Sequence, residues 1–325
     1  MDIDLVYLWV NGNDPVWKAK HDAFTGTKPH NEAVDGKGRY VSHDELKYSL
    51  RSAEMYAPWI HRIFIVTDNQ VPEWLNTANP KVQIVDHTEI LPPEALPCFN
   101  SVVIEHHLHR IPGLSEHFLY ANDDMFFNRP VTPADFFSKK DELPIIRFNR
   151  RPFRKFSLWY RQHVQHKSLS NYKRTIHNAA LLVESRYGTY YSGKGHHNID
   201  AYLKSTHAFT RQLFKEEIDA TLANHVRADN DIQRNIYSYV ALAEHKGHLD
   251  YVTQHTSFRL HIDNHQLYKK FMRYQPLLFC MNDSEYANDA DREYAANFLS
   301  SYFRQKSSFE LWYTAIYQPN WGAGL

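Results

Sequence analysis

A chain of 325 residues is long enough for one large α/β domain with a helical annex, and its formal net charge of +0 at pH 7 gives no overall field that would attract nucleic acid. Its two cysteines, Cys98 and Cys280, exclude a disulfide framework and a CxxC zinc pattern, and they favour a reducing compartment. The sequence shows neither a signal peptide nor an apolar stretch long enough to span a bilayer. We therefore expect a cytoplasmic protein whose membrane contact would be peripheral, on the inner face.

The first half of the sequence alternates short apolar runs with segments of helical pattern. The apolar runs predict strands, in chain order, at residues 3–10, 63–68, 82–86, 118–127 and 144–148. Segments with helix start and stop signals lie between them, at residues 42–57, 71–75 and 100–111. This alternation predicts an α/β fold with a mostly parallel sheet in a three-layer arrangement.

The second half is mainly helical by pattern, most clearly at residues 231–245. Residues 24–39 are rich in Gly, Lys and Asp without periodicity, which predicts a loop near a strand end. The last forty residues are rich in Tyr and Phe. We therefore expect a catalytic domain of residues 1–285 and a helical C-terminal extension of residues 286–325 packed on it.

Two adjacent carboxylates, Asp123 and Asp124, interrupt the apolar run of residues 118–127. A strand end is where an α/β sheet presents its chemistry, and paired carboxylates are costly there unless a positive charge sits beside them. Mg²⁺ commonly binds one or two carboxylates together with substrate phosphate oxygens. The alternative is an ordinary turn, in which Asn and Asp are common residues.

A basic stretch, residues 143–183, contains no Asp or Glu. Its nine cations are Arg147, Arg150, Arg151, Arg154, Lys155, Arg161, Lys167, Lys173 and Arg174. The stretch is a candidate surface for a phosphate, a charged glycan or a membrane face. The alternative is a solvated surface that is balanced by acidic residues elsewhere.

Three other positions carry reactive side chains. Glu105 and His109 would share a helix face, as a proton acceptor and its partner or as a simple surface ion pair. The basic surroundings of His177 should lower its pKa and keep it a neutral base, although a lone His is often structural. Arg227 precedes an acidic helix start and is suited to bind phosphate; helix capping is the alternative explanation of that segment. The His-rich residues 105–109 and 195–197 lack a zinc pattern.

Several of these pieces occur in an order that resembles the Stealth family. That family comprises bacterial capsular polysaccharide phosphotransferases and the precursor of the animal lysosomal-enzyme N-acetylglucosamine-1-phosphotransferase. Residues 4–12 resemble its first conserved region, and its long second region is matched by residues 44–52, 57–59, 63–67 and 122–124. The surroundings of His177 resemble the third region, except that Asn178 follows where the family often has Pro nearby. Residues 227–233 resemble the fourth region.

The resemblance implies a glycosyltransferase-A-like core that uses a UDP-sugar donor, such as UDP-GlcNAc, and Mg²⁺ or Mn²⁺. The implied reaction transfers a sugar 1-phosphate to a hydroxyl of an acceptor glycan, lipid-linked or free, and releases UMP in capsular or cell-surface polysaccharide synthesis. The implied catalytic residues are Asp4, Glu105, Asp124, His177 and Arg227, with Asp123 and Asp124 on the metal. The implied donor-binding residues are Trp9, Asn11, Gly12 and Arg51.

The general base would be His177 or Glu105, and we favour His177. Two other functions remain open. A metal-dependent glycosyltransferase would use the same donor and carboxylates but would break the sugar–oxygen bond and release UDP. A non-catalytic glycan- or nucleotide-binding module would explain the aromatic and basic residues but not the paired carboxylates. The sequence carries no signal for an oligomeric state.

Overall fold

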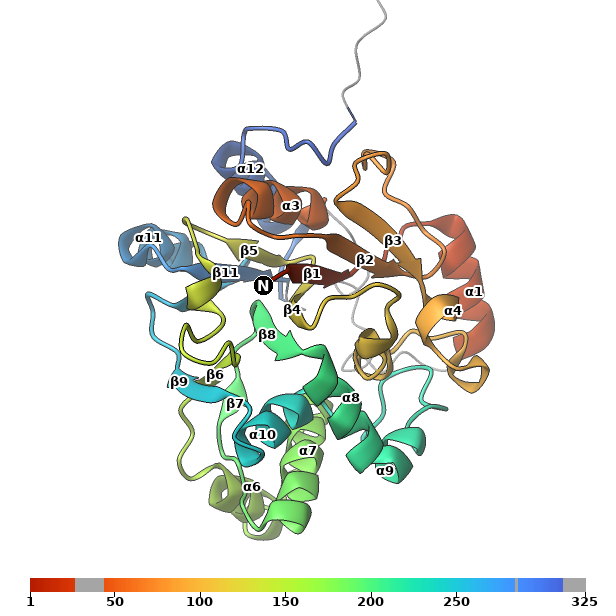
Figure 1. The fold of residues 1–325 in the computed structure, drawn as a ribbon, viewed down its shortest axis with the longest axis vertical. Helices are drawn as coiled ribbons and strands as arrows, with labels where there is room; N and C mark the ends of the chain where they lie inside the picture. The colour runs from red at the N-terminus through yellow and green to blue at the C-terminus, as the bar shows by residue number, and fades with distance from the viewer. Residues whose placement is uncertain (27–43, 284–285, 312–325) are drawn as a thin grey trace, which may run out of the picture.

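The computed structural model describes residues 1–26, 44–283 and 286–311. Its central sheet has five strands in the order β3-β2-β1-β4-β8 (Figure 1). Four of them are parallel: β1 (Ile3–Leu8), β2 (Ile63–Thr67), β3 (Val82–Asp86) and β4 (His117–Asn122). The fifth, β8 (Asp200–Leu203), pairs antiparallel with β4. The predicted α/β class with a mostly parallel sheet is confirmed.

Helices cover both faces of this sheet, and a hydrophobic core lies on each side. Figure 1 shows α3 (Glu45–Tyr56) on one side and α7 (Asn171–Tyr187), α8 (Lys204–Leu213) and α10 (Asn235–Ala243) on the other. Successive side chains of a strand point to opposite faces, so Leu5 packs with the α3 core and Val6 with the α10 core. The three-layer arrangement follows from this double burial.

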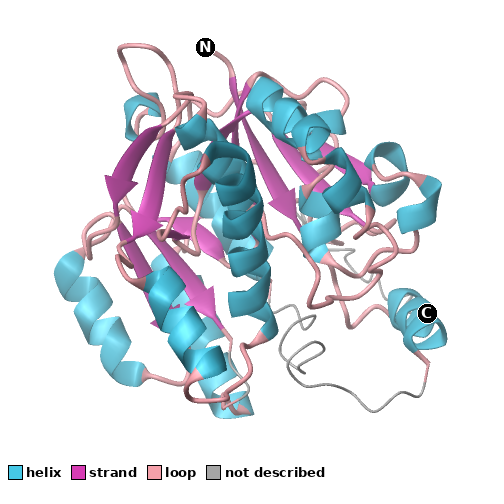
Figure 2. Cartoon of the chain, turned by 90° about the horizontal axis from the view of Figure 1, so that it is seen from below, coloured by secondary structure: helices cyan, strands magenta, loops and turns pink. Residues whose placement is uncertain are grey.

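Two smaller sheets adjoin the central one. One has the order β10-β11-β5 and the other β7-β6-β9. Their strands are β5 (Met125–Phe127), β6 (Ile145–Asn149), β7 (Lys194–Gly195), β9 (His248–Tyr251), β10 (Ser257–His261) and β11 (Leu278–Asn282). Seen from below in Figure 2, helices surround the strands of these sheets.

The remaining helices connect or flank these strands. The α-helices are α1 (Pro15–Thr25), α4 (His87–Ile90), α5 (Ser101–Glu105), α6 (Arg154–His163), α9 (Lys215–Asp219), α11 (His265–Tyr274) and α12 (Asp289–Tyr302). The 3₁₀ helices are η1 (Pro93–Ala95), η2 (Leu108–Arg110) and η3 (Pro133–Asp135). Within the part of the chain that the structure describes, no helix is both long enough and apolar enough to cross a bilayer.

Four predicted elements differ from the structure. The predicted strand of residues 118–127 divides into β4 and β5, which belong to different sheets. The predicted helix of residues 71–75 is wrong, because these residues form a turn in which Leu75 bridges to Glu310. The helix predicted to reach residue 111 ends at Glu105, where buried His106 bonds to Tyr237. The helix predicted at 231–245 is shorter, Asn235–Ala243. The predicted loop at 24–39 falls mostly outside the described residues.

The end of the described chain is joined to α3 by a buried ion pair. Arg51 donates from Nε and Nη2 to the two carboxylate oxygens of Glu310, each at 2.7 Å, and from Nη1 to the Phe303 carbonyl at 2.7 Å. Both side chains are buried. The residues that follow α12 are thereby fastened to α3. The boundary at residue 285 stays a prediction.

Replacing Arg51 with Met should lower the free energy of unfolding by roughly 3 kcal/mol, because Glu310 would remain buried without its partner. Burial alone would raise the pKa of Glu310, but Arg51 holds it below 4.5, so the pair stabilises the fold above about that pH and loses its effect as pH falls further. Urea unfolding at pH 7 and pH 4 measures both effects. An Arg51→Met variant as stable as wild type at pH 7 would contradict this account; Arg174→Met, at a more exposed pair, is the control.

Candidate active site

The carboxyl ends of β1 and β4 meet at the point where the strand order reverses. The order 3-2-1-4 places later strands on both sides of β1, and such a switch point leaves a crevice outside the strand ends. Leu8, the last residue of β1, pairs with Asn122, the last residue of β4. Residues 9–12 and the acidic pair Asp123 and Asp124 therefore follow neighbouring strands at the same edge of the sheet. This is the expected position for a ligand site.

The acidic pair sits in the turn between β4 and β5. Burial raises the pKa of Asp123 well above its ordinary value, and the carboxylates of Glu45 and Asp124 add to the shift. Asp124 Oδ2 lies 3.4 Å from His197 Nε2, whereas its Oδ1 is buried without a hydrogen-bond partner in the described chain. A carboxyl group with a raised pKa, Asp123, thus lies next to a carboxylate oxygen without a hydrogen-bond partner in the described chain, Asp124 Oδ1. A divalent cation bound between them would stabilise both carboxylates.

Those same described residues contain no group of three or more His, Cys, Asp or Glu side chains arranged to hold a metal ion. Two carboxylates would therefore need ligand oxygens to complete a coordination shell. This is the usual behaviour of Mg²⁺, which binds one or two carboxylates together with substrate phosphates and waters.

A buried network of charges joins β4 to β8 and α10. The Tyr120 hydroxyl lies 2.8 Å from Glu105 Oε1 and 2.7 Å from Asn122 Oδ1. Arg234 stacks its guanidinium over the Tyr120 ring at 4.7 Å, donates to Asp200 at 3.1 Å and reaches Glu105 at 3.5 Å. Glu105 is thus held by a phenol and a cation. The predicted pairing of Glu105 with His109 on one helix face is wrong, because α5 ends at Glu105.

Asp200 connects this network to the histidines that precede β8. Its Oδ1 lies 3.0 Å from His196 Nε2, and His196 Nδ1 lies 3.0 Å from Ser257 Oγ. Burial alone would raise the pKa of Asp200, but His196 and Arg234 hold it below its ordinary value. The adjacent His197 reaches Asp124, so the segment bridges the network and the acidic pair.

Five cations from separate elements gather beside this network and form what we call the cation cluster: Arg151, Arg154, Lys173, Lys194 and Arg259. Lys194 Nζ lies 4.4 Å from the centre of the Tyr172 ring. Burial and the neighbouring cations, Arg259 first among them, lower the pKa of Lys194 to about 8. In the described structure no member of the cluster forms an ion pair with a carboxylate.

The cation cluster extends to the acidic pair through a single residue. Arg259 on β10 is paired in register with Cys280 on β11, and the pKa of that thiol is raised by burial and then by the Asp124 charge. In the described chain, the cation cluster and Asp124 therefore have a common neighbour in Cys280. The arrangement suits a ligand that carries a metal ion on one side and negative charge on the other.

His177 lies on α7, next to the cation cluster. Its Nδ1 is 2.8 Å from the Tyr190 hydroxyl. Burial, followed by Arg154 and Lys155, lowers its pKa below the ordinary 6.5, which agrees with the direction expected from the basic stretch. The side chain is half-buried and neutral at pH 7.

Arg227 lies in a loop that is clasped to α7. Its Nη2 donates to Ser101 Oγ at 3.0 Å, at the start of α5. The Asn178 side chain donates to the backbone carbonyls of Asp229 and Asp231, at 2.9 and 3.0 Å. The segments around His177 and Arg227 thus lie side by side, although fifty residues separate them.

Asp4 lies near the amino end of β1, at the opposite end of the strands from the acidic pair. It pairs with Phe118 at the start of β4, roughly 15 Å from the acidic pair at about 3.3 Å per residue. Its carboxylate accepts from the backbone N–H groups of Arg62 at 3.1 Å and Ser115 at 2.7 Å. This position disagrees with the catalytic role predicted for Asp4. The Asp4 carboxylate instead holds the two segments that contain Arg62 and Ser115.

Two of the expected donor-binding residues are also buried elsewhere. All the donor nitrogens of Arg51 are occupied by Glu310 and Phe303, so Arg51 is not available to a nucleotide. Trp9 is 8% exposed and packs in the core beneath α3. Asn11 and Gly12 are at the crevice edge, where the Asn11 backbone N–H and carbonyl each bond to the Gln70 side chain at 2.9 Å.

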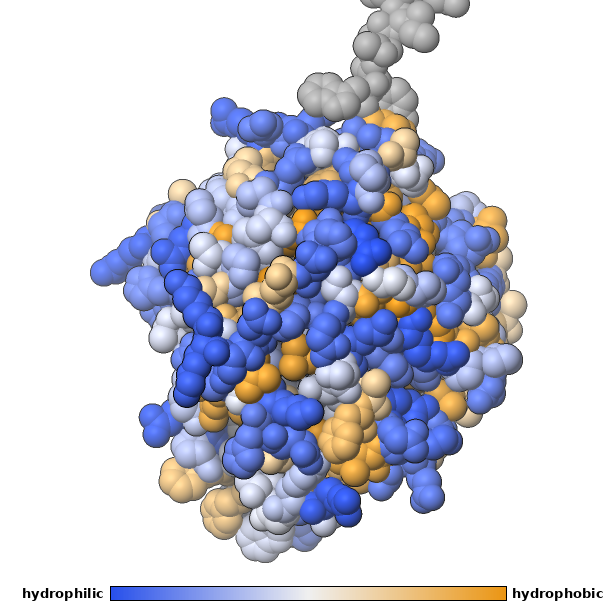
Figure 3. All heavy atoms as spheres, in the orientation of Figure 1, coloured by the Kyte–Doolittle hydropathy of each residue, from blue (hydrophilic) through white to orange (hydrophobic). Residues whose placement is uncertain are grey.

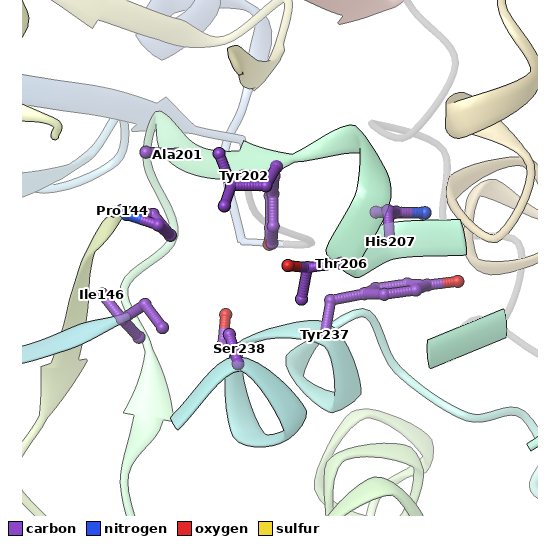
Figure 4. Close-up of a pocket in the computed structure, with 10 residues that line it drawn as sticks. Pro144, Ile146, Ala201, Tyr202, Thr206, His207, Tyr237 and Ser238 are labelled. Atoms are coloured by element: carbon purple, nitrogen blue, oxygen red, sulfur yellow. The ribbon is translucent and has the colours of Figure 1, made fainter. Parts of the chain in front are cut away.

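Two small cavities lie under β8, each with room for about one water molecule. The first, shown in Figure 4, is lined mainly by apolar groups and by His207 and Tyr237. The second is lined by Tyr172, His196, Asp200 and Arg234 of the polar network. Each is too small to admit a sugar nucleotide.

Lys194, His197, Asp200, Arg234 and Arg259 were not expected from the sequence. His197 belongs to a His-rich segment that had been weighed only as a zinc site. Arg234 begins a helix that is otherwise apolar, and a charge within such a pattern indicates a buried partner. That signal could have identified Arg234 but not its partners.

The described fold is an α/β protein with paired carboxylates at its switch point and a cation cluster near them. Conserved region 1 of the Stealth proteins matches residues 1–29, and conserved region 2 matches residues 39–145. A capsular polysaccharide phosphotransferase of Haemophilus influenzae is 33% identical over 299 residues, which cover 88% of this chain and 79% of that protein. The chain belongs to the Stealth family.

Other relatives are longer. The exopolysaccharide phosphotransferase CpsY of Mycobacterium tuberculosis is 35% identical over 93% of this chain, which spans 57% of that protein. An exopolysaccharide phosphotransferase of Streptomyces coelicolor is 56% identical over 42% of this chain, which spans 23% of its length. Among solved structures, the galactosyltransferase LgtC is 10% identical with a TM-score of 0.42, covering 94% of this chain and 96% of its own.

Replacing Lys194 with Met should weaken the binding of inorganic pyrophosphate by about tenfold, which corresponds to about 1.4 kcal/mol. The expectation follows from a half-buried cation with no carboxylate partner. Isothermal titration without added metal measures the affinity. Lys269→Met, on the exposed side of α11, is the control and should bind as wild type. Equal affinity in all three proteins would remove Lys194 from any anion site.

Proposed function

We propose that this chain transfers a sugar 1-phosphate from a UDP-sugar to a hydroxyl of an acceptor glycan. The products would be a phosphodiester and UMP, in the synthesis of a capsular or cell-surface polysaccharide. Family membership supports the proposal. The single observation that carries it is the acidic pair at the switch point together with a nearby cation cluster that has no carboxylate partner among the described residues. UDP-GlcNAc is the donor to test first.

Asp123 and Asp124 would hold Mg²⁺ or Mn²⁺ against the diphosphate of the donor. The bound ion would supply neutralisation of the phosphate charge. Arg227 and the cation cluster would receive the remaining negative charge of the transferring phosphate. Phosphoryl-type transfer depends more on positioning and electrostatics than on covalent help from the protein, and both features are properties of these charged groups.

In the proposed step the acceptor hydroxyl oxygen bonds to the sugar-side phosphorus, and the bond from that phosphorus to the oxygen shared with UMP breaks. The hydroxyl proton passes to His177. If Nδ1–H donates to Tyr190, Nε2 carries the free lone pair. Glu105 is less suited as the base, because its Oε1 already faces Tyr120 and Arg234.

The nucleotide product separates this reaction from a glycosyltransferase. Attack at phosphorus should release UMP and leave a ³¹P phosphodiester signal in the glycan, whereas attack at the anomeric carbon releases UDP. Chromatography of the nucleotides after incubation with UDP-GlcNAc and acceptor measures the ratio. UDP as the sole nucleotide product, with a phosphorus-free glycan, would reject the phosphotransferase in favour of the glycosyltransferase.

Asp124→Asn should abolish turnover and leave the melting temperature unchanged or slightly higher, since a repulsion between like charges is removed. Asp289→Asn, on the exposed start of α12, is the matched control and should be fully active. Wild type should lose activity in EDTA and regain it with Mg²⁺ or Mn²⁺. Turnover by a folded Asp124→Asn protein would exclude Asp124 from the reaction.

His177→Ala should lower kcat by roughly 10²-fold while donor affinity barely changes, as expected for loss of a general base. Because its pKa lies below 6.5, wild type should keep its activity below pH 6.5 and lose it as His177 becomes protonated at lower pH. Glu105→Gln is the parallel variant, and the larger loss of kcat identifies the base. If donor binding collapses instead, His177 is a donor ligand.

A further inference from the structure

Helix α6 (Arg154–His163) turns an aromatic face outward. Within α6 and at its two ends, five large hydrophobic side chains are exposed: Phe153 at 76%, Phe156 at 64%, Trp159 at 49%, Tyr160 at 42% and Val164 at 48%. At 100° per residue they fall within roughly 140° of the helix circumference. Leu158, on the opposite side, is buried. A surface helix normally has the reverse arrangement, with its apolar face toward the core.

The aromatic rings on this face contact one another rather than the core. Phe156 stacks on Trp159 with 5.9 Å between ring centres, and Trp159 stacks on His163 at 5.4 Å. Lys155 fastens the helix to α7 through Glu184 at 2.6 Å. Figure 3 shows hydrophobic residues on the surface at the lower end of the molecule, where Figure 1 places α6. A contiguous apolar surface of this kind usually has a partner.

The charges that α6 and its two ends carry are positive, although Lys155 is paired with Glu184 of α7. The basic stretch of residues 143–183, which includes α6, has no Asp or Glu. Other cations of this segment are Arg150, Arg161 and Lys167. Phe, Trp and Tyr beside Lys and Arg on one helix match a helix that lies in a membrane interface, with its rings at the headgroup level and its cations on anionic lipid.

We propose that α6 and its flanking residues dock this chain on an anionic lipid bilayer. The aromatic side chains enter the boundary between headgroups and acyl chains, and the flanking cations contact the headgroup phosphates. The helix lies in the plane of the membrane and does not cross it. Phe and Val on the exposed face favour lipid over a glycan, because sugar-stacking sites rely on aromatic rings beside polar groups that hydrogen-bond to hydroxyls.

Docking through α6 also brings the site to the membrane surface, because α7 beneath it carries His177. A lipid-linked acceptor would then meet the crevice without leaving the bilayer. This consequence rests on the proposed function, whereas the lipid contact does not. Failure of one can therefore be told from failure of the other, since vesicle binding needs no turnover.

Co-sedimentation of the full chain with vesicles tests the proposal. Vesicles of phosphatidylglycerol and phosphatidylcholine should bind the protein, pure phosphatidylcholine should bind it weakly, and 0.5 M salt should reduce binding to the anionic vesicles, as expected with a Debye length of about 4 Å. The double variant Phe156→Ser with Trp159→Ser should bind at least tenfold more weakly. Phe209→Ser, at a side chain 45% exposed on α8, is the matched control.

The charge contribution has its own variants. Arg150→Gln, Arg161→Gln and Lys167→Gln together should weaken binding to anionic vesicles, whereas Lys269→Gln with Lys270→Gln on α11 should not. All substituted positions lie on the surface, so the melting temperatures should equal that of wild type. Dibromo-lipids should quench part of the tryptophan fluorescence, and Trp159→Phe should remove that part.

Three results would overturn the proposal. The aromatic double variant could bind vesicles as well as wild type. It could instead lose affinity for a soluble oligosaccharide acceptor while vesicle binding persists, which would make the face a glycan surface. Alternatively, wild type could self-associate in solution through this face and leave vesicles unbound, with the double variant monomeric by sedimentation.

Discussion

Repulsion between the adjacent carboxylates Asp123 and Asp124 is the main electrostatic constraint at the switch point. Asp123 is held beside Asp124 and near Glu45, so burial and like charge both oppose its ionised form. Among the described residues, His197 lies 3.4 Å from Asp124, and positive charge gathers around Lys194 on β7 and Arg259 on β10. Opposite charges are thus kept apart, and a ligand that carries a cation and phosphate groups would satisfy both.

The surrounding fold keeps the acidic pair and the cation cluster from forming ion pairs with each other. Glu105 and Asp200 share Arg234 as their cation within the buried network that joins β4, β8 and α10. Because Arg234 is already engaged there, it does not move to the acidic pair. The rigid parallel pairing of β1 and β4 sets the position of the carboxylates, and the two smaller sheets bring Lys194 on β7 and Arg259 on β10 to the same crevice.

The basic stretch has two different roles along its length. Arg151, Arg154 and Lys173 point their charge toward the crevice and take part in the cation cluster, whereas the exposed face of α6 combines its cations with aromatic rings. A single acid-free segment thus supplies both a boundary of the candidate active site and an outward surface. The two roles share α7, to which Lys155 and Arg154 are bonded.

Local pattern was sufficient for the buried strands, the acidic pair at a strand end and the family. The run at residues 63–68 is apolar enough to be buried on both faces, so it is a strand whatever packs against it. Packing alone decided that the run at 118–127 divides between two sheets, that Asp4 and Arg51 lie away from the crevice, and that Lys194, Asp200, Arg234 and Arg259 lie beside it. Periodicity records which face of a segment is buried, whereas the meeting of charges from segments up to about 150 residues apart depends on how the faces pack together.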